Sequence, residues 1–401
     1  MRRLEAWLED RHTGTFIDDG STVEFVYDED ASAPISLSLP REGRMTKLAP
    51  ARFLENLLPD NPRARRWMAE AYGSGTLDTI DLLAVAGGDV AGGLVLLPEG
   101  QEPTAEIPEL DPALERDIAT RIRAIKDNPD AWTAHGALER FSLAGTQGKF
   151  SLAKVEDDWY WSNATVPSTH IIKPARNDLP GLEDVEAATL SLAVRSGVPA
   201  PTAHILTVSD QTAYLVERFD RASAEDSPLA RRVHTEDLAQ AFGLAPGAKY
   251  DPAAHQVIDL LKRHDDTANT LQEAFLQQLV FNTLIGNADA HAKNYSLVLH
   301  PDRVEFAPLY DAVPVSLYPQ YDQQLAMRIA GARYSQAVTA AHWRKFSRST
   351  GLDTDWTMQI VTDVAEQLRT ESATAWATVP GPQAEHLRAE ISRTTDATLR
   401  N

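Results

Sequence analysis

Asp289 and Asn294 lie five residues apart in a polar segment, and Asp311 follows seventeen residues after Asn294. In the catalytic loops of protein kinases, this spacing separates an aspartate that orients the attacking hydroxyl from an asparagine that binds Mg²⁺, and a later aspartate also binds the metal. The chemistry open to these residues is therefore phosphoryl transfer. The spacing also occurs in ordinary loops, so a polar connection with Asp289 as a turn residue remains an alternative.

The flanking segments predict elements that would bring these side chains together. Residues 270–285 have the apolar periodicity of a helix, and Gly286 is a natural helix stop. Residues 295–299 and 304–306 predict two short strands joined by a four-residue turn. Because the outer ends of a hairpin lie close together, Asn294 and Asp311 are expected to meet at one point.

The part of the chain before this helix predicts many strands and could supply a nucleotide site. Strands are expected at residues 138–144 and 150–155, on either side of the glycine-containing turn 145–149. The backbone amides of such a turn can approach phosphate groups. By itself, the segment is better interpreted as a plain hairpin turn.

Lys173 follows an apolar pair and is expected at the end of a strand. A kinase lysine in that place neutralises the nucleotide phosphates, although most lysines simply face the solvent. Glu186 lies near the start of a helix predicted over residues 182–196 and is the residue expected to hold this lysine, with Glu183 as the second choice. An acidic residue in a first turn is also favourable for the helix alone.

A buried strand predicted from Tyr214 leads into Glu217, Arg218 and Phe219, whose backbone could form a hinge that binds adenine. His291 is interpreted as a loop or nucleotide contact, because the histidines have no metal-binding spacing such as His-Glu-x-x-His. Each of these signals is weak alone. Their order along the chain is stronger evidence, since it runs from glycine turn through lysine, glutamate, hinge and base to metal ligands.

Composition limits the remaining possibilities. The chain has 401 residues, 43% of them hydrophobic, so two or three subdomains with real cores are expected. It has no cysteine, which excludes disulfides and thiolate catalysis and is compatible with the cytoplasm. The charged N-terminus does not resemble a signal peptide, and no membrane span is expected. The net charge of −20 opposes strong non-specific nucleic-acid binding by this chain alone.

The organisation that we expect has three parts: residues 1–104, residues 105–233 and residues 234–401. In the first part, one helix is predicted over residues 50–72, and the apolar stretch 82–97 is interpreted as buried strands. A proline- and charge-rich linker follows at residues 98–108. The second part is dominated by strands and the third by helices, which is the order of the two lobes of a kinase.

These segments together resemble the HipA family of toxin–antitoxin serine/threonine kinases, over nearly the whole chain. The matching segments are residues 36–40, 53–60, 81–83, 92–93, 142–149, 167–173, 216–221, 236–244, 249–250, 284–294 and 310–311. The resemblance implies an α+β, bilobal protein-kinase-like fold with a strand-rich N-lobe, an added N-terminal subdomain and a helical C-lobe. Gly148 departs from the family, which often has an acidic residue there.

The resemblance also implies the site residues. Asp289 matches the catalytic aspartate, Asn294 and Asp311 the magnesium ligands, and Ser142 a serine whose autophosphorylation flips the phosphate loop outward and inactivates the enzyme. The residues expected to bind ATP are Ala144, Gly145, Thr146, Gln147, Gly148, Lys149, Lys173, Glu217, Arg218, Phe219, His291, Lys293 and Tyr310.

The function expected from the resemblance is a cytoplasmic toxin kinase that uses ATP and Mg²⁺ to phosphorylate a translation-related protein such as an aminoacyl-tRNA synthetase. Its expected partner is a small helix-turn-helix antitoxin, HipB-like, through which it would reach operator DNA. Two alternatives stay open. One is a weakly active or inactive nucleotide-binding corepressor of the antitoxin. The other is a metal nuclease or phosphohydrolase built on Asp289 and Asp311, which would leave Lys173 without a role.

Overall fold

The computed structural model describes residues 1–8, 11–103, 108–133, 139–176, 178–265 and 268–400. The chain forms two compact units, each assembled from segments that are distant in sequence. The first unit contains residues 1–174, 206–248 and 298–303, and the second contains residues 175–205, 249–297 and 304–401. The expected division into three parts is a different partition of the chain and stays a prediction.

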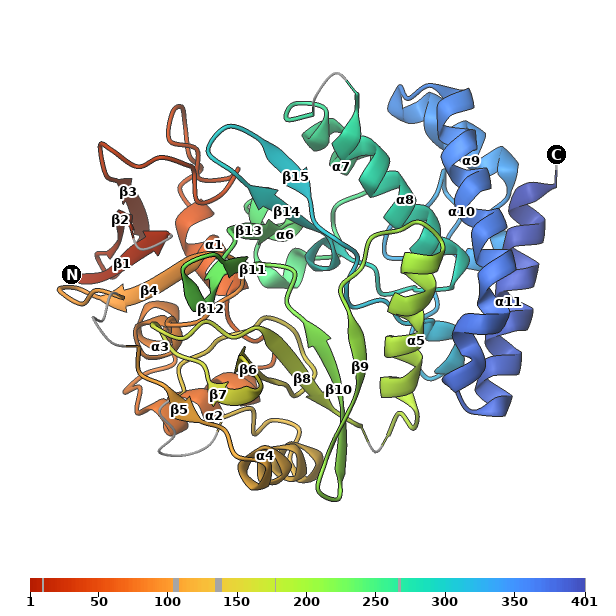
Figure 1. The fold of residues 1–401 in the computed structure, drawn as a ribbon. Coiled ribbons are helices and arrows are strands. Elements are labelled where there is room, and N and C mark those ends of the chain that lie inside the picture. Colours follow the sequence, from red (N-terminus) through yellow and green to blue (C-terminus); the bar gives the residue numbers. More distant parts are fainter. Residues whose placement is uncertain (9–10, 104–107, 134–138, 177, 266–267, 401) are drawn as a thin grey trace. The chain divides into compact units, whose positions relative to one another are not determined.

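The first unit begins with a four-stranded antiparallel sheet of order β3-β2-β1-β4 (Figure 1). In β1 the buried side chains alternate with more exposed ones, as expected of a strand with one covered face. The strands are β1 (Arg2–Leu8), β2 (Arg11–Asp18), β3 (Val23–Tyr27) and β4 (Leu94–Pro98), and the accompanying helices are α1 (Ala49–Asn56), α2 (Pro62–Tyr72) and α3 (Thr79–Ala86).

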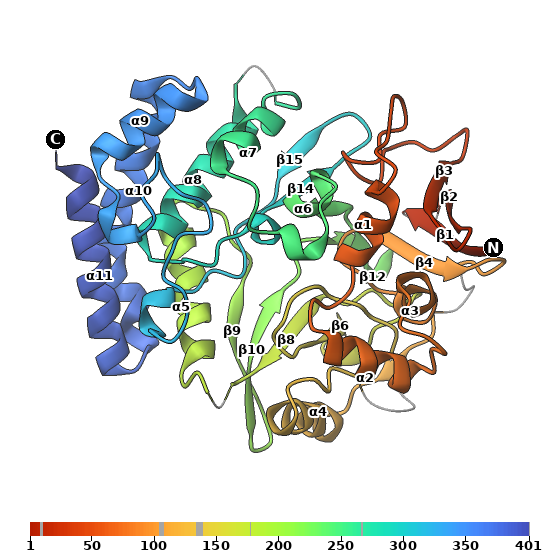
Figure 2. The ribbon, with the colours of Figure 1, turned by 180° about the vertical axis from the view of Figure 1, so that it is seen from behind.

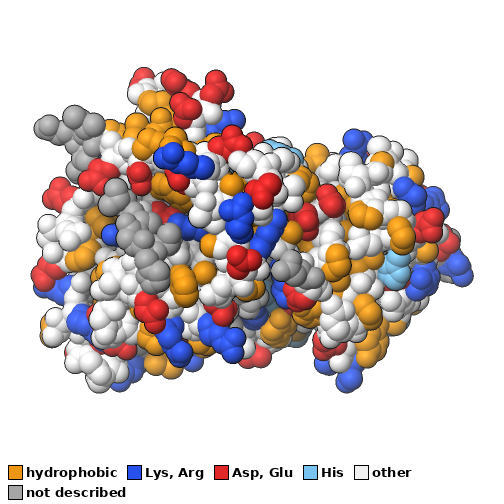
Figure 3. All heavy atoms as spheres, turned by 90° about the horizontal axis from the view of Figure 1, so that it is seen from below, with side chains coloured by type: hydrophobic (Ala, Val, Ile, Leu, Met, Phe, Trp, Pro, Cys, Tyr) orange, Lys and Arg blue, Asp and Glu red, His pale blue; other side chains and the backbone are white. Residues whose placement is uncertain are grey.

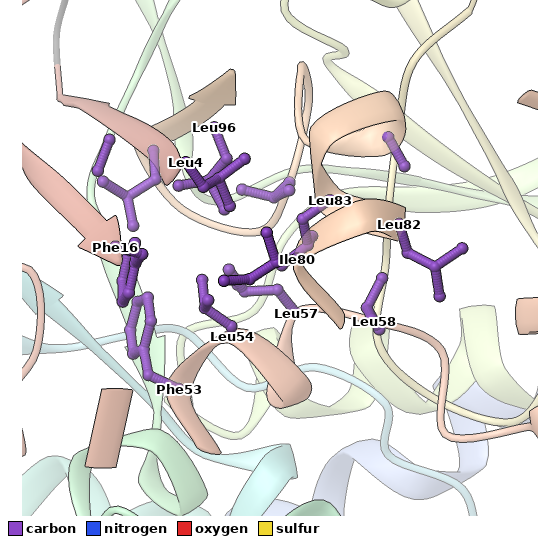
Figure 4. Packing of buried hydrophobic residues seen from close by; sticks show 14 of the residues in the cluster. Leu4, Phe16, Phe53, Leu54, Leu57, Leu58, Ile80, Leu82, Leu83 and Leu96 are labelled. Atoms are coloured by element: carbon purple, nitrogen blue, oxygen red, sulfur yellow. The ribbon is translucent and has the colours of Figure 1, made fainter. Parts of the chain in front are cut away.

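The covered face of this sheet packs against α1 and α3 (Figure 4). Phe16 of β2 stacks on Phe53 of α1 with ring centroids 6.2 Å apart, and both side chains are fully buried. Leu82 and Leu83 extend the same cluster from α3. The N-terminal region thus has a hydrophobic core of its own.

A second sheet of the first unit carries the predicted nucleotide-binding strands. Its order is β5-β7-β6-β8-β10-β9, and α4 (Glu115–Asp127) packs on it through Ile118 and Ile122. The strands are β5 (Asp111–Pro112), β6 (Phe150–Val155), β7 (Asp158–Trp161), β8 (His170–Pro174), β9 (Ala203–Val208) and β10 (Gln211–Glu217), and the first three residues of β9 belong to the second unit. The hairpin of β11 (Arg221–Ala224) and β12 (Ser227–Arg232) comes next, and β13 (Thr235–Asp237) and α6 (Leu238–Ala241) follow it.

The second unit is largely helical (Figure 2). Its central helix is α10 (Thr354–Ala375), which packs against α5, α8, α9 and α11. Asp353 caps the start of α10 by accepting a hydrogen bond from the Trp356 amide at 2.8 Å. The other helices are α5 (Leu182–Arg195), α7 (Ala254–Leu261), α8 (Thr270–Leu284), α9 (Ala340–Thr350) and α11 (Gly381–Leu399). The hairpin strands are β14 (Ser296–Leu299), whose last two residues belong to the first unit, and β15 (Val304–Phe306).

Several sequence expectations agree with these elements, and three are wrong. The single helix expected over residues 50–72 is two helices, because Pro59 and Pro62 interrupt the run and Pro62 starts α2. The stretch 82–97 contains most of α3 as well as β4, since an apolar run alone does not distinguish helix from strand.

The third error concerns the strand expected at residues 138–144. Leu138 lies outside the described residues, and residues 139–144 contain only an isolated bridge between Phe141 and Asp89. The segment is instead held by contacts with distant parts of the first unit. No helix in the described part of the chain has the length and hydropathy needed to span a membrane.

Candidate active site

The loop that carries Asp289 begins where α8 ends. Gly286 adopts a φ of +75°, a left-handed conformation that glycine allows at little cost. The Asn287 amide then donates a hydrogen bond to the Asn282 carbonyl at 2.9 Å, which closes the turn. The Asp289 side chain lies exposed beyond this turn. A rigid helix end therefore positions an accessible carboxylate.

Asn294 lies in a short 3₁₀ turn and is buried. Its Nδ2 donates a hydrogen bond to the backbone carbonyl of Asp289 at 3.1 Å. Because the NH₂ group faces the loop, the amide oxygen is the atom that can bind a cation. The contact ties the predicted base and the predicted metal ligand together within one loop.

Asp311 follows β15 and is exposed, with a φ of +53°. A positive φ is uncommon for a residue other than glycine, although aspartate adopts it more readily than most. Asp289 and Asp311 both oppose the lowering of the His291 pKa, as expected of carboxylates in the neighbourhood of that imidazole. The expected meeting of Asn294 with Asp311 at one point stays a prediction.

His291, in the same loop as Asn294, is also buried. Burial lowers the pKa of His291 to about 4, and the Lys249 ammonium lowers it as well, while Asp289 and Asp311 oppose both effects. The imidazole is therefore neutral at pH 7. Its Nδ1 is buried and makes no hydrogen bond within the described part of the chain. A neutral ring nitrogen suits a nucleotide contact, which stays a prediction.

Lys293 and Tyr310, both expected to bind ATP, are linked to each other. The Tyr310 hydroxyl donates to the Lys293 carbonyl at 2.8 Å and lies 2.6 Å from the Ser296 hydroxyl. Tyr310 therefore connects the loop that carries Lys293 to the start of β14. This is a structural task that the sequence did not indicate.

Glu186 is buried in α5, whereas Glu183 is half-buried. Both lie near Tyr318, whose pKa burial raises to about 12, with Glu183 and Glu186 adding to the shift. Lys173, the expected partner of Glu186, belongs to the first unit. The pairing of Lys173 with Glu186 stays a prediction.

The first unit holds the predicted phosphate loop, residues 144–149, and Ser142 anchors its start. The Ser142 side chain is fully buried, and its hydroxyl donates to the Leu57 carbonyl at 2.8 Å. The Ser142 amide donates to the Asp89 carbonyl at 3.0 Å, and the Asp60 amide donates to the Gly145 carbonyl at 2.9 Å. The N-terminal region therefore holds the loop at several points.

At two glycines of this loop, an added Cβ would come too close to neighbouring atoms. Gly145 has a φ of +111°, and a Cβ there would lie 2.7 Å from Lys149 Nζ. A Cβ on Gly148 would lie 2.8 Å from the Pro129 carbonyl oxygen and 2.6 Å from Ile125. Gly148, the departure from the family pattern, is thus required by its surroundings.

Lys149 and Lys173 are the two lysines of the first unit that the sequence predicts to bind ATP. Lys149 donates to the Ala144 carbonyl at 2.8 Å and lies 5.5 Å from the ring centre of Trp132. Lys173 is buried in β8, opposite Tyr214 of β10, with its ammonium 5.5 Å from the tyrosine ring centre. Lys173 therefore lies on a strand, as the sequence predicted.

The hinge segment leads into a buried ionic cluster that the sequence did not reveal. The Arg218 amide donates to the Thr169 carbonyl at 2.8 Å, which continues the pairing of β8 with β10. Its guanidinium binds Asp220 at 2.7 Å, and Arg221 binds Asp89 at 2.8 Å. Burial favours the neutral form of Asp220, but Arg218 and Arg221 outweigh burial and lower its pKa.

Because of this cluster, the Arg218 side chain stabilises the fold beside the hinge. The nucleotide-binding role of Glu217, Arg218 and Phe219 stays a prediction. Asp89 serves two segments, since its carboxylate binds the hinge arginines and its backbone carbonyl accepts from Ser142. The local sequence contains no signal for this link.

The chemistry of the second unit's donors fits Mg²⁺. Across the described residues, no group of three or more His, Cys, Asp or Glu side chains could hold a metal ion. Magnesium sites for nucleotides do not need such a group, because one or two carboxylates combine with phosphate oxygens and water. The Asn294 amide and the Asp311 carboxylate are ligands of that kind.

Tyr250 is the residue of this site to which the sequence assigned no role. Its hydroxyl donates a hydrogen bond to Asp289 Oδ1 at 2.6 Å, although the two residues are 39 positions apart. Its ring stands edge-on against His291, with centroids 5.0 Å apart.

Comparisons with known proteins agree on one family. The family described as the HipA N-terminal domain matches residues 4–97, and the HipA-like C-terminal domain matches residues 141–372. The Sinorhizobium fredii protein named "Putative kinase Y4mE" is 31% identical, covering 91% of this chain and 90% of the relative. The serine/threonine-protein kinase toxin HipA of Shewanella oneidensis is 30% identical, covering 91% and 87%.

The fold agrees with a solved relative as well. A structure of Shewanella oneidensis HipA with HipB and operator DNA has a TM-score of 0.85 and 26% identity, covering 99% of this chain and 97% of that one. The expected α+β, kinase-like fold is confirmed by this match. The chain therefore belongs to the HipA family of toxin–antitoxin serine/threonine kinases.

Proposed function

We propose that this chain is an active serine/threonine kinase toxin that transfers the γ-phosphoryl group of ATP to a protein hydroxyl. The observation that carries the proposal is the loop of the second unit. The loop presents an exposed Asp289 and fixes Asn294 through a 3.1 Å hydrogen bond. Asp311, which follows β15, acts electrostatically on His291 of the same loop. A base and two metal ligands are the parts that phosphoryl transfer requires.

In this proposal Asp289 accepts the proton of a substrate serine or threonine hydroxyl. The hydroxyl oxygen forms a bond to the γ-phosphorus, the bond to the bridging oxygen breaks, and ADP leaves. Asn294 and Asp311 would hold Mg²⁺, which would neutralise phosphate charge. The neutral His291 can donate or accept a hydrogen bond beside them without adding positive charge.

The first unit contributes nucleotide binding in this proposal. Gly145 and Gly148 let the backbone of residues 144–149 pack closely against its surroundings. The backbone amides of such a turn can approach phosphates. Lys149 and Lys173 supply positive charge, and Glu186 positions Lys173. The segment Glu217–Phe219 binds adenine through its backbone.

We also propose self-inactivation by phosphorylation of Ser142. The Ser142 hydroxyl is fully buried and bonded to Leu57, so the loop must leave this position before the hydroxyl can react. A phosphate carries a charge of about −1.5 to −2 and three acceptor oxygens, which the buried position cannot accommodate. The modified loop would therefore stay outside and could not bind nucleotide.

The proposed partner is a small helix-turn-helix antitoxin, supported by the Shewanella oneidensis complex of HipA, HipB and operator DNA. Operator DNA would be reached through that antitoxin, since this chain carries a net charge of −20. The proposed substrate is a translation-related protein of the cytoplasm, such as an aminoacyl-tRNA synthetase.

One experiment tests the proposal. The purified chain is incubated with γ-labelled ATP and Mg²⁺, beside Asp289→Asn, and phosphorylated residues are mapped by mass spectrometry. Label on serine or threonine in the wild type and its loss in Asp289→Asn are expected. Binding of ATP without transfer would instead indicate a nucleotide-binding corepressor. Cleavage in a parallel nucleic-acid incubation would indicate a nuclease.

A further inference from the structure

We infer that Tyr250 is a positioning residue for the base Asp289, a role that rests on the proposed function. The Tyr250 hydroxyl donates to Asp289 Oδ1 at 2.6 Å. A hydrogen bond from a neutral hydroxyl to a carboxylate is short and stronger than one between neutral groups. Asp289 is otherwise exposed at the tip of its loop, so this contact restrains the orientation of its carboxylate.

The phenol reaches Asp289 because its own segment is built into the catalytic loop. The Lys249 carbonyl accepts a hydrogen bond from the Ala292 amide at 3.0 Å, which attaches the backbone beside Tyr250 to the residue after His291. The Tyr250 ring stands edge-on against the buried His291, at 84° and 5.0 Å. The Lys249 ammonium lies 5.5 Å from the same ring centre. These contacts fix the ring on two sides.

The arrangement restrains the base while leaving it able to act. An ionised carboxylate has two oxygens and about four acceptor positions, so a bond from Tyr250 to Oδ1 does not prevent Asp289 from accepting a substrate proton. Catalysis by a positioned base depends on its distance and angle to the hydroxyl. Loss of the phenol hydroxyl should therefore slow the chemical step more than it weakens ATP binding.

The decisive variant is Tyr250→Phe, which keeps the ring and its packing on His291 and removes only the hydroxyl. The matched control is Tyr334→Phe, at another exposed tyrosine of the second unit whose hydroxyl makes no hydrogen bond to the described residues. ATP turnover and phosphate incorporation are measured for both variants, with ATP affinity by calorimetry. Asp289→Asn serves as the reference for loss of the base.

We expect Tyr250→Phe to lower kcat about tenfold with KM and Kd for ATP within about twofold, because the lost bond acts on the base and not on the nucleotide. Tyr334→Phe should match the wild type. The melting temperature is also measured for Tyr250→Phe, for Asp289→Asn and for the double variant Tyr250→Phe/Asp289→Asn. The change in the double variant should differ from the sum of the two single changes, as expected of groups in contact.

If Asp289→Asn is inactive, the proposed base stands, and any of three results would then overturn the inference about Tyr250. The first is a wild-type kcat in Tyr250→Phe. The second is an increased kcat in this variant, which would show that the phenol hinders the reaction. The third is phosphate mapped to Tyr250, which would show that the residue is a substrate. If Asp289→Asn keeps the wild-type rate, the proposed base is wrong and the proposed function fails together with this inference.

Discussion

At the scale of single residues, the two carboxylates of the candidate site are held in different ways. Asp289 accepts a hydrogen bond from the Tyr250 hydroxyl, and Asp311 adopts a backbone φ of +53°. A backbone in that conformation costs energy that the surrounding structure must offset. Such strain is common at functional sites. The strained backbone of Asp311 is therefore consistent with the proposal that this residue binds a metal.

Asn294→Ala and Asp311→Ala should both weaken Mg²⁺-dependent ATP binding, with the larger loss in Asp311→Ala. A carboxylate is a stronger magnesium ligand than an amide, and its charge balances that of the ion. Calorimetry with ATP in the presence and absence of Mg²⁺ measures the effect. Asp302→Ala, at an exposed residue of the β14–β15 turn, is the control. Equal Mg²⁺-dependent affinities in the wild type and both variants would argue against a metal site here.

Ser142→Ala should abolish phosphorylation of the loop and prolong activity, while lowering the free energy of unfolding. The variant leaves the Leu57 carbonyl without the hydrogen bond that Ser142 donates, at a cost of roughly 1 to 3 kcal/mol. Intact-mass spectrometry after ATP incubation and urea unfolding measure the two effects, with the exposed Ser392→Ala as the control. Phosphate at a different residue, or normal ATP binding by phosphorylated protein, would contradict the proposed switch.

At the scale of elements, the phosphate loop depends on close packing against α4 and the residues after it. Gly148→Ala would place a Cβ 2.8 Å from the Pro129 carbonyl oxygen, so the loop must shift. We expect a loss of ATP affinity of about tenfold and a destabilisation of roughly 1 to 3 kcal/mol. Gly75→Ala is the matched control, since its Cβ would have nothing within 4 Å. Wild-type ATP affinity in Gly148→Ala would show that the loop position is unimportant.

A second element-scale feature links β13 to the N-terminal region through a buried carboxylate. Glu236 of β13 accepts hydrogen bonds from the Ser36 hydroxyl and from the Leu37 amide, the latter at 2.8 Å. Burial raises the pKa of Glu236 to about 8, while the two hydrogen bonds act in the opposite direction. The folded chain therefore keeps Glu236 protonated at pH values where the unfolded chain has released the proton.

This difference predicts a pH dependence of stability. The contribution of Glu236 to stability is complete below pH 4.5 and is lost as pH rises toward about 8, because the unfolded state binds fewer protons in that window. Glu236→Gln cannot ionise, so its stability relative to the wild type should improve by roughly 3 to 5 kcal/mol between pH 5 and 8. Urea unfolding across this range measures it, with the exposed Glu225→Gln as the control. A constant difference between Glu236→Gln and wild type would contradict the buried protonated form.

At the scale of the whole molecule, charge determines which partners the chain can bind directly. The net charge is −20, and acidic and basic side chains are interspersed on the face shown in Figure 3. Affinity for duplex DNA depends largely on lysines and arginines that neutralise phosphates. A strongly acidic net charge therefore opposes strong non-specific DNA binding by this chain alone.

We expect the isolated chain to bind duplex DNA with a Kd weaker than about 10 µM at physiological salt. Together with its antitoxin, it should join a complex on operator DNA, as supported by the solved relative. Fluorescence anisotropy of labelled operator DNA, with the antitoxin alone as the control, separates these cases. Submicromolar binding by the isolated chain would show that its own surface contacts DNA.

The sequence by itself determined the features that depend on neighbouring residues. Helix α8, the β14–β15 hairpin and the strand carrying Lys173 follow from local periodicity and turn residues, which operate over one or two turns of chain. The order of the candidate site residues along the chain could also be predicted from the sequence, because each residue lies in a locally recognisable element. Their spacing within the Asp289–Asn294 loop is a local property as well.

Only the tertiary structure decided the contacts between residues that are distant in sequence. Tyr250 meets Asp289 across 39 positions, and Arg221 meets Asp89 across 132, with no pattern in either local segment to predict the pairing. The same holds for Ser142 and Leu57, and it explains why residues 139–144 are anchored by distant groups in place of the expected strand. Local propensity is a weak guide there, because burial and long-range hydrogen bonds determine the backbone conformation.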